Sequence, residues 1–131
     1  MSPSMVPSHS PALVVQLARL GDVIQSLPVI EALQHANPAR AVDVLCASPL
    51  VSIARRCASV RSVLGWDGAQ WRRLAQQWNA EPSLVLRSAQ EQLVPDGVSA
   101  YEVVYNLNQH ARSRLAAHLY GRRVVGAGVG G

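Results

Sequence analysis

The segment 13–33, LVVQLARLGDVIQSLPVIEAL, constrains the fold of this chain more than any other. A continuous apolar run leads to Gly21 and Asp22, and an apolar-rich stretch of helical length follows them. This pattern predicts a buried strand that passes through a one-glycine turn into an amphipathic helix. Open α/β folds bind ligands at the carboxyl ends of their strands, so Asp22 is the first candidate for chemistry.

The rest of the chain repeats this alternation. We expect strands at residues 12–17, 42–47, 61–66, 101–107 and 122–125. The first helix should end at residue 36, and further helical stretches should span 50–58, 69–94 and 111–120. Pro82 should divide the long helical stretch, with its second piece at 84–93. Pro28 falls inside the pattern of the first helix, so either the first turn of that helix is irregular or the helix begins near Pro28. Alternating strands and helices predict an α/β fold with a Rossmann-like, doubly wound parallel sheet.

The length of 131 residues suits one domain, which we place at 12–131 after a disordered leader at 1–11. Phe is absent, so small aliphatic residues must fill the core, which suits strands buried on both faces. The N-terminus has neither the basic nor the apolar region of a secretory signal, and no apolar run is long enough to span a membrane. These features predict a cytoplasmic protein.

The net charge of +4 comes from arginines dispersed along the chain, which favours anionic partners such as phosphates, acidic sugars or acidic lipids. We expect no nucleic-acid partner, because no basic stripe or aromatic stacking platform is visible. Cys46 and Cys57 are too few for a disulfide framework and predict free, buried thiols in a reducing compartment. The four histidines show no metal-ligand spacing, so no metal is expected.

Asp22 allows two interpretations. Aspartate is a preferred helix N-cap, and Gln25, three residues later, completes a capping-box pattern. Alternatively, its carboxylate is a general base that takes a proton from a hydroxyl nucleophile.

A second polar group follows the predicted fourth strand, at the same sheet edge as Asp22: Asn106, Asn108, Gln109 and His110. These side chains either contact a sugar or phosphate ligand or serve turn and helix-capping roles.

Two further patterns have simple interpretations. The glycine-rich end, 126–131, matches the dinucleotide-binding spacing only formally, since no helix follows it. We interpret it as a flexible end. Trp71, Leu74 and Trp78 form an apolar stripe that suits core packing better than docking on an anionic membrane.

The segment 13–33 resembles the N-terminus of glycosyltransferase family 9, the lipopolysaccharide heptosyltransferases. The apolar strand, the Gly21-Asp22 pair and the Leu27-Pro28 pair carry the resemblance. Weaker similarity continues through residues 37–45, 101–108, 112–113, 119–121 and 123–126.

The resemblance implies the N-terminal, acceptor-side half of a GT-B fold. It implies transfer of a sugar, heptose by the family's precedent, from a nucleotide-diphosphate sugar to a lipopolysaccharide inner-core acceptor, with inversion and without a cofactor or obligatory metal. Asp22 takes the place of the family's catalytic base. By their positions, the candidates for acceptor binding are Arg19, Gly21, Asn106, Asn108 and Arg112.

Two departures from the family pattern modify these expectations. Many members carry an aspartate where this chain has Asn106. The C-terminal, donor-binding domain is missing, so the isolated chain should be inactive unless a separate donor-binding half joins it.

Peripheral contact with the inner membrane is a further expectation. The alternatives are a non-catalytic module that binds an acidic glycan or a partner, and a degenerate fragment.

Overall fold

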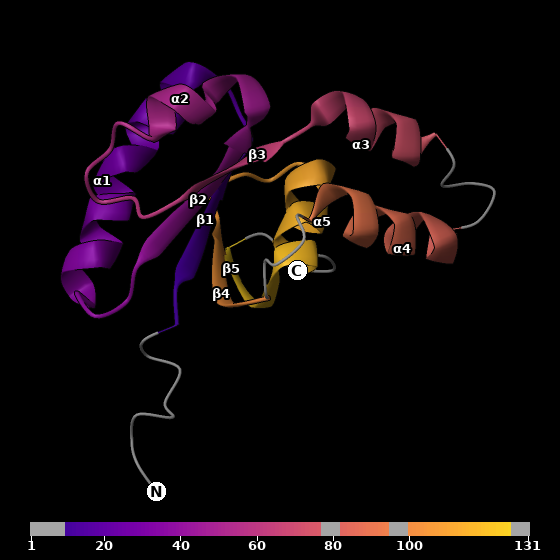
Figure 1. The fold of residues 1–131 in the computed structure, drawn as a ribbon. Coiled ribbons are helices and arrows are strands. Elements are labelled where there is room, and N and C mark those ends of the chain that lie inside the picture. The colour runs from indigo at the N-terminus through magenta and orange to yellow at the C-terminus, as the bar shows by residue number, and fades with distance from the viewer. Residues whose placement is uncertain (1–9, 77–81, 95–99, 127–131) are drawn as a thin grey trace, which may run out of the picture.

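The computed structural model describes residues 10–76, 82–94 and 100–126. Five parallel strands form one sheet in the order β3-β2-β1-β4-β5 (Figure 1). The strands are β1 (Ala12–Gln16), β2 (Val42–Ala47), β3 (Val63–Trp66), β4 (Tyr101–Asn106) and β5 (Gly121–Gly126). The sheet is built outward from β1 in both directions, which confirms the doubly wound α/β prediction.

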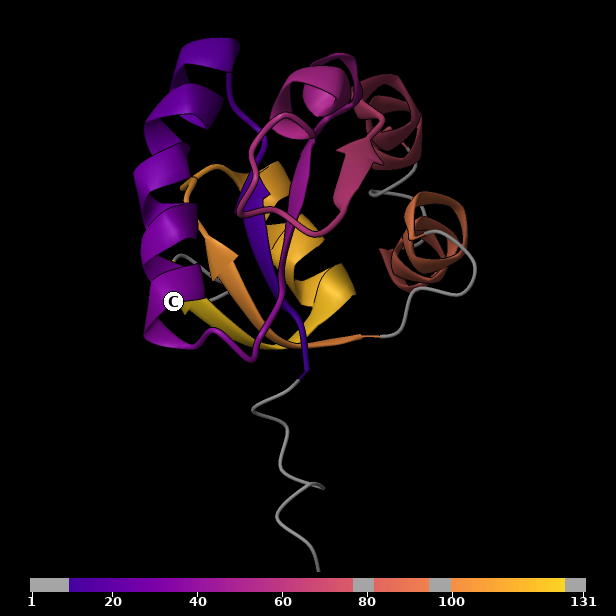
Figure 2. The ribbon, with the colours of Figure 1, turned by 60° about the vertical axis from the view of Figure 1, so that its left-hand side comes forward.

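Helices cover both faces of the sheet. The helices are α1 (Leu20–Ala36), α2 (Val51–Ala54), α3 (Gly68–Ala75), α4 (Pro82–Leu93) and α5 (Ala111–Tyr120), with a 3₁₀ turn, η3 (Ser48–Leu50), before α2. Figures 1 and 2 show α1 and α2 on one face and α3, α4 and α5 on the other. None of the helices in the described part of the chain is long and apolar enough to cross a bilayer.

Each face has its own apolar core. Val14, Val44 and Cys46 face α1 and α2, which contribute Val23, Ile30 and Ala54. Leu13, Val15 and Leu45 face the other way, onto a cluster completed by Trp66, Leu74, Ala89, Leu93, Ala116, Ala117 and Tyr120. Burial on both faces explains why β1 and β2 consist almost entirely of apolar residues, with Gln16 and Asp43 as the exceptions.

Several predicted boundaries were wrong. The predicted helix at 50–58 is η3 followed by the four-residue α2, and β3 begins at Val63 rather than residue 61. Pro28 lies inside α1 on its exposed side, so the helix begins well before it. The helical stretch 69–94 forms two helices, and Leu74 packs in the core with Trp71 against it, as expected. Trp78, the leader at 1–9 and residues 127–131 lie outside the described residues.

Both cysteines are free. Cys46 is buried, and its burial raises the pKa of the thiol to about 11. Cys57 is only half-buried, so the expectation of buried thiols holds for Cys46 alone.

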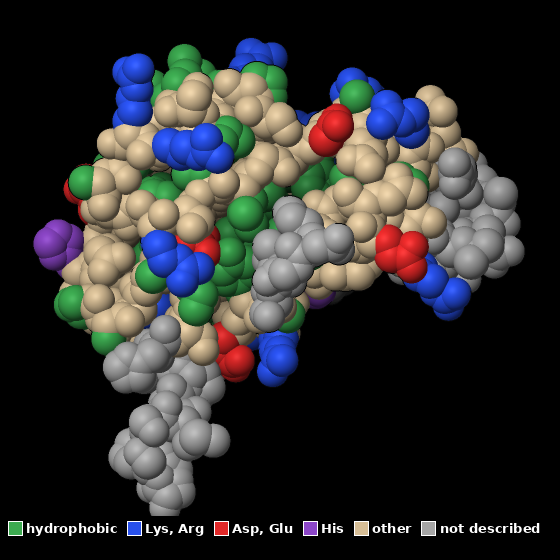
Figure 3. Space-filling model, viewed as in Figure 1, with side chains coloured by type: hydrophobic (Ala, Val, Ile, Leu, Met, Phe, Trp, Pro, Cys, Tyr) green, Lys and Arg blue, Asp and Glu red, His purple; other side chains and the backbone are tan. Residues whose placement is uncertain are grey.

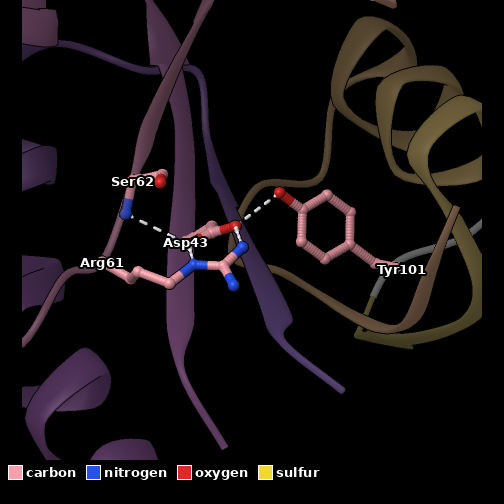
Figure 4. A network of polar contacts seen from close by, with 4 residues as sticks. All are labelled: Asp43, Arg61, Ser62 and Tyr101. Carbon is pink, nitrogen blue, oxygen red and sulfur yellow. Dashed lines mark hydrogen bonds and ion pairs between the residues drawn. The ribbon is translucent and has the colours of Figure 1, made fainter. Parts of the chain in front are cut away.

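At the amino edge of the sheet, one buried carboxylate on β2 contacts β4 and the two residues that precede β3 (Figure 4). Asp43 on β2 is 1% exposed and accepts two hydrogen bonds from the Arg61 guanidinium, at 2.9 and 2.6 Å. It also accepts the Ser62 N–H at 3.1 Å and the Tyr101 hydroxyl at 2.6 Å. Burial and the bond to Asp43 raise the pKa of Tyr101, so the phenol stays protonated and donates. The sequence analysis did not anticipate this network.

We expect Asp43→Asn to lower the free energy of unfolding by about 2–3 kcal/mol, because the amide pairs poorly with Arg61 and Tyr101. This loss is at or below the lower end of the range for breaking a fully buried ion pair, because the Arg61 side chain is 52% exposed and solvent screens its charge. Chemical denaturation measures it. Glu102→Gln, at the half-buried neighbour of Tyr101, is the control and should change stability by less than about 0.5 kcal/mol. Equal losses in both variants would contradict a special role for Asp43.

Candidate functional site

The candidate site lies at the carboxyl edge of the sheet, where β1 and β4 end side by side. Val15 on β1 is paired with Asn106 on β4. From this pair the chain leaves toward β2 on one side and toward β5 on the other. Such a switch point opens a crevice between the two departing connections, and ligands of doubly wound folds bind there.

A network of polar side chains joins the two connections. Asn108 accepts the Leu17 N–H through Oδ1 at 2.6 Å and donates through Nδ2 to Gln16 Oε1. Gln16 in turn donates to Ser26 Oγ at 2.9 Å, and Ser26 donates to the Asp22 carbonyl at 2.7 Å. The residues that follow β1 are thereby fixed to those that follow β4 and to the first turns of α1.

Asn106 is buried, at 5% exposure, and its Oδ1 accepts the Asn108 N–H at 3.0 Å. This bond of Asn106 is turn chemistry, as one interpretation of the sequence held, whereas the side chain of Asn108 makes long-range bonds to Leu17 and Gln16 that neither interpretation predicted. A ligand contact by either residue stays a prediction. His110 is the N-cap residue of α5 but makes no side-chain capping bond.

Asp22 is exposed and is the third residue of α1. Its Oδ2 accepts the backbone N–H of Arg19 at 3.3 Å. Arg19, not Asp22, occupies the N-cap position, so the predicted N-cap role for Asp22 and its box with Gln25 were wrong. Asp22 instead stands where a capping box places its acidic residue, near the positive end of the helix dipole.

Arg19 and Gly21 lie beside Asp22 and are also exposed. A Cβ atom built on Gly21 would meet nothing within 4 Å, so this glycine is not required by packing. The exposed edge around Asp22 therefore has space above the backbone for a ligand to approach.

The predicted acceptor residue Arg112 lies elsewhere on the same edge. It lines an open cleft of about 630 Å³ between the ends of β1, β2 and β3 and the starts of α3 and α5. Trp66, Asp67, Trp71 and Arg72 also line this cleft. Asp22 and Arg19 do not line it, so the structure divides the predicted site residues between the α1 start and the cleft.

Trp66 and Arg72 are the cleft residues that the sequence analysis missed as site candidates. One signal was available, because Trp66 ends a predicted strand and therefore had to reach the carboxyl edge. Asp67, which follows it, caps α3 by accepting the N–H groups of Ala69 and Gln70 at 3.0 and 3.1 Å.

His110 stands next to this edge. Burial and the neighbouring Arg112 lower the pKa of His110, so its imidazole is neutral at pH 7. Within the described ranges, no group of three or more His, Cys, Asp or Glu side chains has the geometry to hold a metal ion. Figure 3 shows the arginines of one face lying apart from one another rather than in a stripe.

Comparisons with known proteins give a likeness of fold. No known sequence family matches the chain, and no curated protein matches it significantly. Among solved structures it is similar to the glycosyl transferase family 9 protein from Veillonella parvula, with a TM-score of 0.64 and 16% sequence identity. The match covers 90% of this chain and 36% of that one, so this chain spans about a third of the neighbour's length. At this identity the likeness shows a shared fold, a Rossmann-like α/β half.

We expect Asn108→Ala to loosen the segment that follows β1, because the Leu17 N–H loses its acceptor and Gln16 Oε1 keeps only the Ala18 N–H as a donor. Hydrogen exchange at the Leu17 amide should become about tenfold faster or more, and the unfolding free energy should fall by about 1–3 kcal/mol. Gln109→Ala, at the exposed neighbour, should change neither. Unchanged exchange at Leu17 in the Asn108 variant would show that the network does not hold this segment.

Proposed function

We propose that this chain is the acceptor-side half of a glycosyltransferase related in mechanism to the lipopolysaccharide heptosyltransferases. The observation that carries the proposal is the exposed Asp22 carboxylate, which lies at the carboxyl edge of the sheet beside the β1–β4 switch point. The fold is shared with a glycosyl transferase family 9 protein. The donor is a nucleotide-diphosphate sugar, heptose by the family's precedent, bound mainly by a second half. The acceptor is a lipopolysaccharide inner-core sugar.

In this proposal Asp22 is the general base. Its Oδ2 accepts one backbone hydrogen bond, which fixes the carboxylate at the start of α1. Oδ1 has no partner among the described residues and is available to an acceptor hydroxyl. The base takes the hydroxyl proton as that oxygen attacks the anomeric carbon, and the nucleoside diphosphate leaves with the bonding electrons. General-base catalysis of this kind contributes about 10²–10⁴-fold to rate.

The polar network supports this role indirectly. Ser26 donates to the Asp22 carbonyl, and through Gln16 and Asn108 the first turns of α1 are tied to the loop after β4. A base held within the productive geometry needs such support, because a misplacement of about 1 Å can cost about 100-fold in rate. Arg19 and Gly21 on the α1 side and Arg112 in the cleft flank the place that an acceptor would occupy.

A second half has a suitable surface to contact. Leu20 and Ile24, next to Asp22 in α1, are 40% and 51% exposed. Large apolar side chains exposed together at a proposed active-site edge suit an interface that closes over the reacting groups. Contact there would place the donor sugar against Asp22.

We expect Asp22→Asn to reduce sugar transfer at least about 100-fold, since the amide cannot accept the proton. The assay combines the chain with a donor-binding half. It measures the nucleoside diphosphate that is released when the acceptor is added. The asparagine Oδ1 can still accept the Arg19 N–H, so the free energy of unfolding should fall only by the helix-dipole contribution of about 0.3–1 kcal/mol. Glu31→Gln, which removes another exposed carboxylate of α1, is the matched control. Transfer within about twofold of the parent in the Asp22 variant would exclude its role as base.

A further inference from the structure

The outer edge of β5 has the form of a template for a further strand. β5 is the last strand of the sheet, and within residues 10–76, 82–94 and 100–126 it pairs with β4 alone (Figure 1). Its six residues include no proline, so alternate N–H and C=O groups along its outer side are able to pair with another strand. β3, at the other end of the sheet, has four residues. β5 is therefore the longer of the two edge strands.

Two glycines fix β5 against the sheet. A Cβ atom on Gly121 would lie 2.1 Å from Val104 Cγ2, and one on Gly126 would lie 2.4 Å from the Asn106 carbonyl oxygen. Both ends of β5 thus lie too close to β4 for a side chain to fit between them. A strand that pairs with the outer edge of β5 meets a preformed partner, so the cost of ordering falls on the incoming segment alone.

The side chains of β5 place a positive charge on each face of this edge. Val124 packs against the core on the α5 side of the sheet. Because side chains alternate along a strand, Arg122 shares that face, and Arg123 and Val125 lie on the α1 side. Both arginines are exposed, and neither forms an ion pair with any described residue. Val125 is 41% exposed, so apolar surface follows the two charges along the strand.

These charges determine which strand fits. A second copy of this chain would bring its own Arg122 and Arg123 to the same edge, and like charges on adjoining strands destabilise their pairing. A strand with two adjacent acidic residues instead places one carboxylate on each face, beside each guanidinium group. β-branched residues next to that acidic pair would cover Val125 and favour the extended conformation.

We propose that the outer edge of β5 binds an extended segment of a partner protein by strand addition, and that this segment carries two adjacent acidic residues opposite Arg122 and Arg123. Backbone hydrogen bonds supply the affinity, and the two charges supply the preference. The added strand is antiparallel, which is the more stable pairing. The inference rests on β5 itself and does not require sugar transfer by Asp22.

The test titrates the chain with capped six-residue peptides and follows its backbone amides by nuclear magnetic resonance. The acidic peptide, threonine-valine-valine-glutamate-glutamate-threonine, places its glutamates opposite Arg123 and Arg122 in an antiparallel pair. It should bind with a Kd of about 1 mM or tighter and shift the β5 amides most.

Two further peptides separate charge from backbone pairing. A peptide with lysine in place of glutamate should bind about tenfold more weakly, because both ion pairs become repulsive. An acidic peptide that is methylated at every backbone nitrogen keeps its charges but cannot donate to the edge. It should therefore bind at least about tenfold more weakly than the unmethylated acidic peptide.

Variants of the chain test the two arginines. Arg122→Gln combined with Arg123→Gln should weaken binding of the acidic peptide about tenfold and remove its advantage over the lysine peptide. The matched control combines Arg55→Gln with Arg56→Gln, two exposed neighbouring arginines at the end of α2, and lowers the net charge by the same amount. The control should bind the acidic peptide as the parent does.

Three results would overturn the inference: amide shifts that are largest outside β5, equal affinity for the acidic and lysine peptides, or undiminished binding of the methylated peptide. Protection of the β5 amides that rises with protein concentration, without any peptide, would assign this edge to a second copy instead. Asp22→Asn should bind the acidic peptide normally, so a failure of the proposed sugar transfer leaves the β5 result intact.

Discussion

The carboxylate of Asp43 is the interaction on which the arrangement of the sheet most depends. It lies on β2, and its partners come from the entry to β3 and from the first residue of β4, on either side of β1. A charge at 1% exposure is tolerated only with full hydrogen bonding, so the three segments must stay in register at this edge. Because neighbouring parallel strands have the same rise per residue, fixing the register at their amino ends also fixes which residues lie side by side at their carboxyl ends.

The two edges of the sheet therefore have different roles. At the amino edge the described polar groups of the Asp43 network satisfy one another, and the network holds the structure. At the carboxyl edge the polar groups are arranged in two ways. Gln16, Ser26 and Asn108 satisfy one another and fix the loops, while the exposed Asp22 carboxylate keeps hydrogen-bonding capacity that the described part of the chain does not use. Unused capacity on a rigid frame is what recognition of a ligand requires.

Sequence reasoning predicted the sheet because its signals are local. Runs of apolar residues such as 12–15 and 44–47 identified buried strands, and the alternation with helices predicted parallel crossovers. The cap of α1 was misassigned because Asp22 is equally compatible with the N-cap and N3 positions, and only backbone geometry separates them. The cleft could not be predicted, since Trp66, Arg72 and Arg112 come from elements whose contact depends on helix packing. Asp43 was missed because its alternation with Val42 and Val44 looks like an ordinary strand, and its partners are 18 and 58 residues away.

The junction between α5 and β5 has no loop, since Tyr120 ends the helix and Gly121 begins the strand. A Cβ on Gly121 would come within 2.1 Å of Val104 Cγ2, so the joint is pressed directly against β4. Because no loop residue separates them, the C-terminal end of α5 cannot move without moving β5. Arg112 lies near the N-terminal end of α5, roughly 12–15 Å along the helix from this junction. One wall of the cleft is thus joined directly to the sheet. The opposite wall, on α3, is joined to β3 through Asp67 alone, so both walls are positioned by the strands that carry them.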